Sequence, residues 1–328
     1  MKVRAIIRSI LALLAVAAMS QSAAAQYPSH PIKVIVSALP GAATDILARV
    51  VAEELSPRLG QPIVVENRSG ASSTIAAGQV AKSAPDGYTL MVSPNSLMIA
   101  PHMLPKGSSG AVDVVNDLVP VAEMAATPIV LLANPGLGVK TIQDFLALAR
   151  RSPGMTYASG GTGSALHLAG ELFQRAAGVK LTHIPYKGLA GATTDVVAGT
   201  VNLMFGTPGG VMGEMINQGK LVPLAVADVQ RSSLLPNVPT YQEAGVKGAE
   251  LDAWFMMFGP SGLPPDILTR LNREIVSVLN LPKVKTRLTA IGVTARAVSQ
   301  ERAAQIVRDD YKRYGEIVKQ AGIGSNAK

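Results

Sequence analysis

Cysteine is absent from this 328-residue sequence, and histidine occurs only four times. Without cysteine the chain forms no disulfide bond, offers no thiolate to a metal ion and carries no cysteine-linked lipid. The histidines are too far apart for a local metal-binding motif. We therefore expect a protein without metal or cofactor, whose fold is held by burial of its core alone. The four histidines are His30, His102, His167 and His183.

Aromatic residues are scarce as well, at 4% of the chain, and there is no long run of basic residues. Binding of single-stranded nucleic acid relies on stacking side chains and a basic track, so we expect no nucleic-acid partner. The formal net charge is nevertheless +8. A mild positive potential of this kind attracts small anions, although ordinary surface charge explains it equally well.

The motifs of common enzyme classes are missing too. The chain has no G-x-S-x-G elbow and no P-loop, and Gly161 and Gly163 lack the third glycine of a G-x-G-x-x-G motif. A catalytic triad assembled from distant residues is not excluded by the sequence. We nonetheless predict that the protein is not an enzyme, and that His167 and His183 are structural.

The N-terminus has the layout of an export signal. Its first eight residues include three basic side chains, residues 10–18 are apolar, and an alanine triplet ends at Ala25. The apolar stretch is shorter than the ~20 residues that a membrane-spanning helix needs. We expect cleavage after Ala25 and release of a periplasmic protein, whose formal charge falls from +8 to +5 with the three basic residues removed.

The rest of the chain alternates strand and helix patterns. Short β-branched runs such as residues 32–36 predict buried strands, and apolar residues at helical spacing follow, as in residues 46–59. The C-terminal part is more helical, with a helix predicted over residues 300–321. Alternation of strand and helix predicts an α/β fold with mostly parallel sheets, and the length predicts two domains.

Two loops of small residues stand between a strand and a helix, at residues 40–45 and 159–164. Small side chains let a ligand approach the backbone, and free N–H groups at a helix start bind anions without Arg or Lys. Ligands of open α/β sheets bind at such loops. A second interpretation is that both are tight turns with helix caps, Asp45 in one and Ser164 in the other. Two such loops in separate halves of the chain favour the ligand interpretation.

Two polar residues near these loops have more than one expected role. A carboxylate that faced an anionic ligand would repel it, so we assign Asp45 mainly to shaping its loop. Asn95 follows a predicted strand and has both a donor and an acceptor. We expect it either to reach the same crevice or to shape its own loop.

Several short motifs carry a resemblance to a known family. They are YPS at 27–29, PGAATD at 40–45, VVENR at 64–68, APDGY at 84–88, LHLAGEL at 166–172 and PYKG at 185–188. In this order they resemble the extracytoplasmic solute receptors of tripartite tricarboxylate transporters, also called Bug proteins. The resemblance covers the chain from about Tyr27 to its C-terminus.

The resemblance implies a two-domain fold of the periplasmic-binding-protein, or venus-flytrap, type with two crossover segments. Residues 26–126 and 228–328 would form domain 1, and residues 127–227 domain 2. It also implies that the first loop holds a carboxylate through backbone N–H groups and ordered water, while residues 162–164 close on its other end. We expect a monomer that delivers its ligand to membrane permease subunits. A periplasmic receptor that feeds a signalling partner is the alternative.

Departures from the family pattern bear on the ligand. Leu39 and Ala42 replace residues of the usual Pro-Pro-Gly-Gly, and Leu39 would put an apolar wall at the cleft mouth. Gly206, followed by Thr207, stands where many relatives have an Asp that pairs with an amino group. These departures favour a di-, tri- or aromatic carboxylate without an amine. The expected ligand-binding residues are Leu39, Gly41, Ala42, Ala43, Thr44, Asp45, Asn95, Ser159, Gly161, Thr162, Gly163, Ser164, His167, Gly206 and Thr207.

Overall fold

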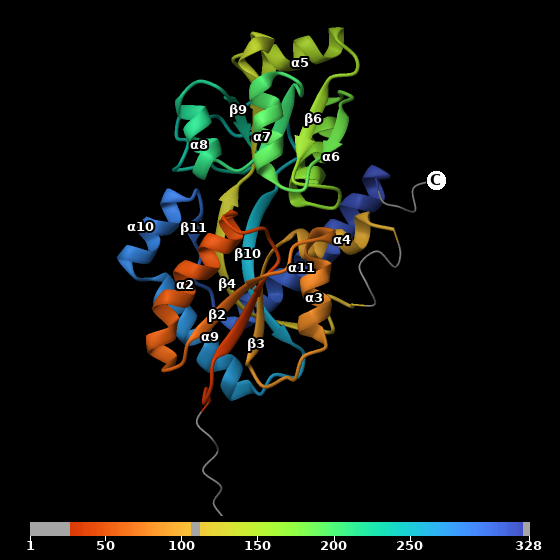
Figure 1. Ribbon diagram of the computed structural model, residues 1–328. Helices are drawn as coiled ribbons and strands as arrows, with labels where there is room; N and C mark the ends of the chain where they lie inside the picture. The colour runs from red at the N-terminus through yellow and green to blue at the C-terminus, as the bar shows by residue number, and fades with distance from the viewer. Residues whose placement is uncertain (1–26, 106–111, 324–328) are drawn as a thin grey trace, which may run out of the picture.

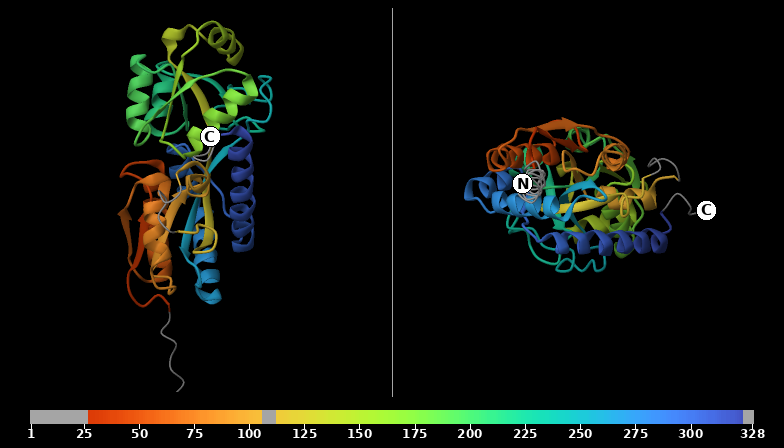
Figure 2. Two further views of the ribbon diagram at one scale, coloured as in Figure 1. Left: turned by 90° about the vertical axis from the view of Figure 1, so that its right-hand side faces the viewer. Right: turned by 90° about the horizontal axis from the view of Figure 1, so that it is seen from below.

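A computed structural model describes residues 27–105 and 112–323 of the chain. The expected signal peptide, residues 1–25, lies outside the described residues. The chain forms two lobes, one above the other, each built around one sheet with helices on its faces (Figures 1 and 2).

The first sheet belongs to the lower lobe and has six strands in the order β11-β4-β10-β3-β1-β2. β1 pairs in parallel with β2 and β3, whereas β10 runs antiparallel to β3 and β4, and β11 antiparallel to β4. Its strands are β1 (Ile32–Val36), β2 (Ile63–Asn67), β3 (Thr89–Pro94), β4 (Leu118–Pro128), β10 (Asp252–Pro260) and β11 (Thr294–Ala295).

The second sheet has five strands in the order β7-β6-β8-β5-β9. β6 pairs in parallel with β7 and β8, and β5 runs antiparallel to β8 and β9. Its strands are β5 (Val130–Ala133), β6 (Thr156–Ser159), β7 (Thr182–Pro185), β8 (Leu203–Gly206) and β9 (Val222–Val226).

Two α/β lobes confirm the predicted fold class, but both sheets are mixed, and the expectation of mostly parallel sheets was wrong. The physical reason is the path of the chain. β4 leads into the second lobe and β10 leads out of it, so these two paired strands run in opposite directions. Strands are parallel only where a helical crossover separates them, as between β1 and β3.

Helices cover both faces of each sheet, and the alternation of strand residues explains which core each face joins. In β1, Val34 and Val36 pack with α2, α9 and α10, whereas Ile35 points to the opposite face with α3 and α4. The helices are α2 (Ala43–Leu59), α3 (Thr74–Ala81), α4 (Ser96–Met103), α5 (Ile142–Arg151), α6 (Ala165–Ala177), α7 (Leu189–Ala198), α8 (Gly210–Asn217), α9 (Pro265–Leu279), α10 (Pro282–Ala290) and α11 (Gln300–Ala321), with short 3-10 turns η1 (Ala71–Ser73) and η2 (Pro135–Leu137).

The chain crosses between the lobes twice, from β4 to β5 and from β9 towards β10. The segment 228–251, which the sequence assigned to domain 1, packs on the second sheet. Tyr241 N–H donates to Val226 O, Leu251 N–H donates to Ala227 O, and the Tyr241 ring lies 5.5 Å from that of Phe173. We propose that the second domain extends to residue 251, and we call residues 129–251 the second lobe and the other described residues the first lobe.

Candidate functional site

The first predicted loop follows β1 and leads into α2. Ala42 is the N-cap residue in an extended conformation, and no side chain caps the helix there. Gly41 has a φ of 80°, in the region that favours glycine. The N–H groups of Ala43 and Thr44 form no hydrogen bond within the described residues. This helix start therefore presents two free donors and the positive end of the helix dipole.

Asp45 shapes this loop from the first turn of the helix. Its carboxylate accepts hydrogen bonds from Gly41 N–H at 2.9 Å, Arg49 Nε at 3.0 Å and Asn67 Nδ2 at 2.9 Å. Burial raises the pKa of Asp45, but the bonds from Arg49, Gly41 and Asn67 outweigh it and hold the pKa below its usual value. The charge of Asp45 is thus compensated by the Arg49 guanidinium and by the donors of Gly41 and Asn67.

The second predicted loop joins β6 to α6, and Ser164 caps the helix by accepting the N–H of His167 at 3.2 Å. Part of this loop is closed on itself. Gly161 N–H donates to Ser159 Oγ, and Gly163 N–H donates to His167 Nδ1. The N–H groups of Gly160 and Thr162 remain without a partner in the described chain. This loop therefore offers fewer donors than the small-residue pattern suggested.

Two stacked histidines contact residues of the second loop. The ring of His167 stacks on that of His183 from β7, and His183 Nε2 lies 2.7 Å from Ser159 Oγ. Burial and the neighbouring His183 lower the pKa of His167 to about 3, and burial lowers the pKa of His183 to about 4. Both rings are uncharged at neutral pH. Their contacts fit the structural role expected from the sequence.

Two hydrogen bonds between the lobes lie at the second loop and the start of α6. Ser72 Oγ donates to Thr162 O at 2.8 Å, and Ala165 N–H donates to Ser96 Oγ at 3.3 Å. Ser72 and Ser96 were absent from the predicted set. The signal that marks Ser72 is the run of small residues 70–73 between β2 and α3, which forms a third loop of the same kind.

Leu39 brings an apolar side chain to the boundary between the two lobes. Its side chain is 51% exposed, and a Cβ built on Gly188 of the second lobe would lie 3.9 Å from Leu39 Cδ1. The first loop therefore faces the turn between β7 and α7. The expected role of Leu39 as an apolar wall at the cleft mouth stays a prediction.

Gly206 ends β8 as a buried residue, and Thr207 after it is half-buried. A Cβ built on Gly206 would lie 2.4 Å from Met212 Sδ and 2.8 Å from Met212 Cε. The space that a side chain at residue 206 would need is thus filled by a methionine from α8. Gly206 can offer a ligand only its backbone.

The side chain of Asn95 forms its hydrogen bonds outside the two loops. It is fully buried, and its amide nitrogen donates to Asp252 O at 3.0 Å and to Tyr314 Oη at 2.9 Å. Of the two roles expected for Asn95, the geometry fits the structural one, because the residue ties β3 to β10 and α11.

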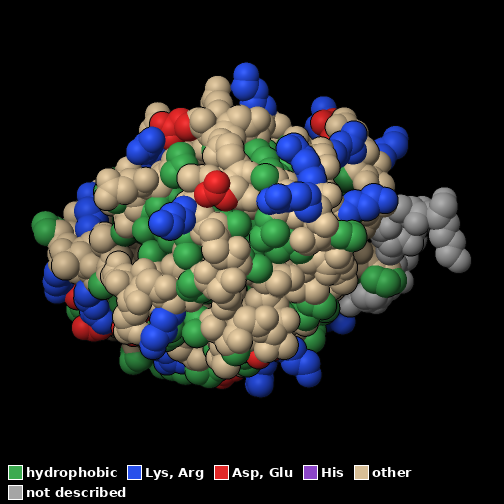
Figure 3. All heavy atoms as spheres, turned by 90° about the horizontal axis from the view of Figure 1, so that it is seen from above, with side chains coloured by type: hydrophobic (Ala, Val, Ile, Leu, Met, Phe, Trp, Pro, Cys, Tyr) green, Lys and Arg blue, Asp and Glu red, His purple; other side chains and the backbone are tan. Residues whose placement is uncertain are grey.

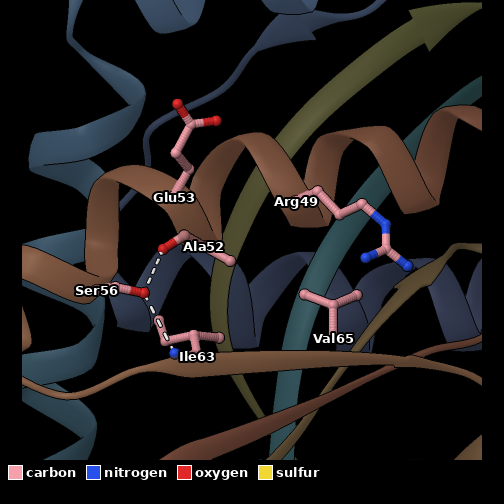
Figure 4. Close-up of a pocket in the computed structure, with 6 residues that line it drawn as sticks. All are labelled: Arg49, Ala52, Glu53, Ser56, Ile63 and Val65. Carbon is pink, nitrogen blue, oxygen red and sulfur yellow. Dashed lines mark hydrogen bonds between the residues drawn. The ribbon is translucent and has the colours of Figure 1, made fainter.

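A shallow groove between α2 and the edge strand β2 contains none of the predicted ligand-binding residues (Figure 4). Its polar groups are satisfied locally. Ser56 Oγ donates to Ala52 O and accepts from Ile63 N–H, while Arg49 binds Asp45 and Asn67. We assign it no ligand.

The charge on one face of the surface and the acidic and histidine side chains of the described residues bear on other kinds of ligand. On the outer face of the second lobe, Lys and Arg lie in small groups among uncharged and hydrophobic side chains (Figure 3). Within the described residues, no cluster of three or more His, Asp or Glu side chains is arranged to hold a metal ion. In the same part of the chain, every helix is too short or too polar to cross a membrane.

Comparison with known proteins gives a consistent result. The family described as "Tripartite tricarboxylate transporter family receptor" matches residues 47–323. BugT of Bordetella pertussis is 36% identical over 299 residues, 90% of each chain. An R. palustris protein solved with adipate is 33% identical with a TM-score of 0.84, covering 91% of this chain and 99% of that one. MatC from Rhodopseudomonas palustris with bound malate is 30% identical with a TM-score of 0.79, covering 89% and 100%.

These matches cover nearly all of the described chain and include relatives solved with carboxylates. The family is one of solute receptors, which confirms that the chain is not an enzyme. Both the motifs and the two-lobed fold lead to the same assignment. The chain belongs to the receptors of the tripartite tricarboxylate transporter family, the Bug-type solute receptors.

Proposed function

We propose that this protein is a periplasmic receptor that captures a small carboxylate between its lobes and delivers it to the permease subunits of a tripartite tricarboxylate-type transporter. The observation that carries the proposal is the free pair of N–H groups on Ala43 and Thr44, at the start of the 17-residue helix α2. A helix start of this kind favours a negative charge. The relatives solved with adipate and with malate, both dicarboxylates, support the ligand class.

The ligand is proposed to have an apolar or plain body and no amino group. Leu39 supplies exposed apolar surface beside the first loop. At the end of β8 no carboxylate is available for an ammonium group, because residue 206 is glycine and Met212 fills the space beside it. A buried ammonium group without a partner would cost binding free energy. Amino acids are therefore expected to bind more weakly than the matching plain carboxylates.

A thermal-shift and calorimetry panel tests the ligand class. It would contain adipate, malate, citrate, benzoate, glutamate and glucose. A ligand present at one hundred times its Kd stabilises the folded protein by about 2.7 kcal/mol, which moves the melting temperature clearly. At least one carboxylate without an amine is expected to do so. If only glutamate or glucose shifts the melting temperature, the ligand proposal is wrong.

The first-loop donors can be tested by one substitution, Ala43→Pro. Proline is well tolerated at the first helical position, and Ala42 before it already has φ −69° and ψ 158°, which proline requires of its neighbour. The change removes the Ala43 N–H without breaking α2. We expect carboxylate binding to be lost while the melting temperature of the free protein stays the same. Ala43→Ser, which keeps the N–H, is the matched control and should retain binding.

Transport and location need separate experiments. Deletion of the gene should abolish uptake of the bound carboxylate if the receptor serves a transporter; intact uptake with an altered transcriptional response would favour a sensory role. The export signal proposed for residues 1–25 predicts a mature protein that starts at Gln26. Intact mass measurement of the periplasmic fraction would check that cleavage.

A further inference from the structure

Two glycine backbones touch where the second lobe meets the first. Gly209 precedes α8 in the second lobe, and Gly292 follows α10 in the first. A Cβ built on Gly209 would lie 2.0 Å from Ile291 O, and one built on Gly292 would lie 2.2 Å from Gly209 Cα. No side chain separates the two lobes at this point, where Figure 1 shows α8 directly above α10 and β11.

The glycine at residue 209 is required by this contact and not by its own conformation. Its φ of −106° and ψ of 170° are extended values that any residue adopts. Gly292 differs, because its φ of 78° favours glycine by itself. An alanine at residue 209 would therefore be compatible with the second lobe taken alone. The three atoms nearest to its Cβ all belong to the turn of the first lobe, and all lie within 2.5 Å.

The turn at residues 291–292 is fixed to the strands that connect the lobes. Thr127 of β4 donates through its hydroxyl to Gly292 O at 2.7 Å, and both residues lie in the first lobe. Shortly after the turn, Arg296 N–H donates to Met124 O, and the Arg296 guanidinium lies 3.3 Å from Glu123 Oε1 and 2.9 Å from Asp252 Oδ2. The surface that Gly209 meets is thus attached to both β4 and β10.

On its other side, Gly209 belongs to the loop that carries Gly206 and Thr207. Because the contact is backbone against backbone, it leaves no flexible side chain to yield when the lobes approach. We propose that the Gly209–Gly292 contact is the stop that limits how closely the second lobe approaches the first, and that Gly209 is a positioning residue for ligand affinity. This inference rests on the proposed capture of a carboxylate between the lobes.

Lobe separation in the variant Gly209→Ala tests the stop directly. Since the chain has no cysteine, the exposed Lys220 and Lys285 can be replaced by cysteine and spin-labelled without interference. Pulsed electron spin resonance then measures the distance between the end of α8 and α10. We expect a longer mean distance in Gly209→Ala than in the otherwise unchanged labelled protein. If the closed population falls to a tenth, the apparent Kd for the carboxylates of the panel rises about tenfold.

A matched control is Gly78→Ala in α3. It is the same chemical change at a residue where the added Cβ meets only Val112 Cγ2 at 3.4 Å. It should leave both the label distance and the Kd unchanged. Equal distance distributions for Gly209→Ala and the labelled parent would overturn the stop, whatever the binding result. Absence of carboxylate binding in the parent would instead contradict the proposed function, since the distance measurement needs no ligand.

A variant that is damaged in its fold would also lose affinity. The melting temperature and the far-UV circular dichroism of the free protein distinguish this case, because the proposed stop predicts that both are the same in Gly209→Ala and the parent. If Gly209→Ala fails to fold, Thr127→Val replaces it. That variant removes the hydrogen bond that holds the turn to β4, so the label distance should broaden. An unchanged distance in a folded Thr127→Val protein would then count against the proposal.

Discussion

The imidazole rings of His167 and His183 lie nearly parallel, with their centroids 3.9 Å apart and 10° between their planes. One ring comes from α6 and the other from β7, so the stack joins a helix to the edge strand of the second sheet. Through Ser159 and the Gly163 N–H, the pair fixes the second loop. Two stacked rings in a buried site tolerate charge poorly, because each cation loses solvation and repels the other.

Stability is predicted to fall as the pH drops below about 6.5, the pKa of histidine in an unfolded chain. The pKa values of His167 and His183 are lowered to about 3 and about 4, so in this range the unfolded chain binds protons that the folded chain does not. His167 then removes roughly 1 kcal/mol of stability per pH unit between pH 6 and pH 4. His183 is less buried, so solvent screens its charge and it removes less. Urea unfolding at a series of pH values measures the slope.

Glu171 and Tyr157 are the other titratable groups that face this pair. Glu171 Oε1 accepts from Tyr157 Oη at 2.6 Å and lies 3.7 Å from His167 Nε2. The double variant His167→Gln with His183→Gln should flatten the slope between pH 6 and pH 4. His30→Gln, at an exposed site, is the control and should leave it intact. An unchanged slope in the double variant would contradict the assignment.

Three consecutive residues other than glycine adopt positive φ angles in the third loop: Ala71 at 43°, Ser72 at 48° and Ser73 at 81°. Such conformations cost roughly 1 kcal/mol per residue. Ser73→Gly should therefore stabilise the protein by up to about 0.5 kcal/mol, after allowance for the greater freedom of glycine in the unfolded chain. Chemical denaturation of the free protein measures it.

Ser72→Gly relieves the same kind of strain but also removes the Ser72 hydroxyl, which donates to Thr162 O across the lobes. We expect this variant to gain less stability against urea than Ser73→Gly and to bind the carboxylate several-fold more weakly, because a hydrogen bond between the lobes is lost. Ser73→Gly keeps that bond and serves as its control. Equal affinities in the two variants would show that the Ser72 contact does not contribute to closure.

Packing under the second loop should make Gly170→Ala destabilising. Gly170 lies inside α6, where alanine usually stabilises, but a Cβ there would sit 2.3 Å from a ring carbon of the fully buried Tyr157. Overpacking of this kind costs about 1–3 kcal/mol. Gly78→Ala in α3, which has room for its methyl group, should instead be neutral or stabilising. The melting temperature of Gly170→Ala should therefore lie below that of the parent protein, and that of Gly78→Ala at or above it.

Much of the fold was predictable because its strands and helices carry strong local signals. The strand at residues 32–36 and the helix over residues 300–321 were predicted with the bounds that the structure gives. β4 was missed, since Pro120 and Glu123 interrupt its pattern. The fold accommodates them by tertiary means: Pro120 lies beside an irregularity in the pairing with β10, and Glu123 is buried against Arg296.

The candidate site was less predictable than the fold. The free donors of the first loop follow from local rules, since small residues before a helix leave N–H groups open. The partners of the second loop do not, because His183 and Ser72 reach it from β7 and η1 through tertiary contacts. The Gly209–Gly292 contact depends on the relative position of the lobes. No pattern within one segment reports it.

Asp45 both stabilises the folded protein and holds the first loop in place. Its three hydrogen bonds at 2.9–3.0 Å stabilise the charged form, so its pKa is lower in the folded than in the unfolded chain. This contribution is fully present above about pH 4, the pKa of aspartate in an unfolded chain, and is lost as the pH falls through the folded value. Asp45→Asn should cost about 1–3 kcal/mol at pH 7 and progressively less below pH 4.

Glu53→Gln, on the same helix, breaks only the exposed pair with Arg287 and should cost less than about 1 kcal/mol. Because Asp45 holds Gly41 in place, Asp45→Asn should also weaken carboxylate binding, whereas Glu53→Gln should not; equal urea midpoints and equal affinities for these two variants would show that the Asp45 bonds do not hold the loop.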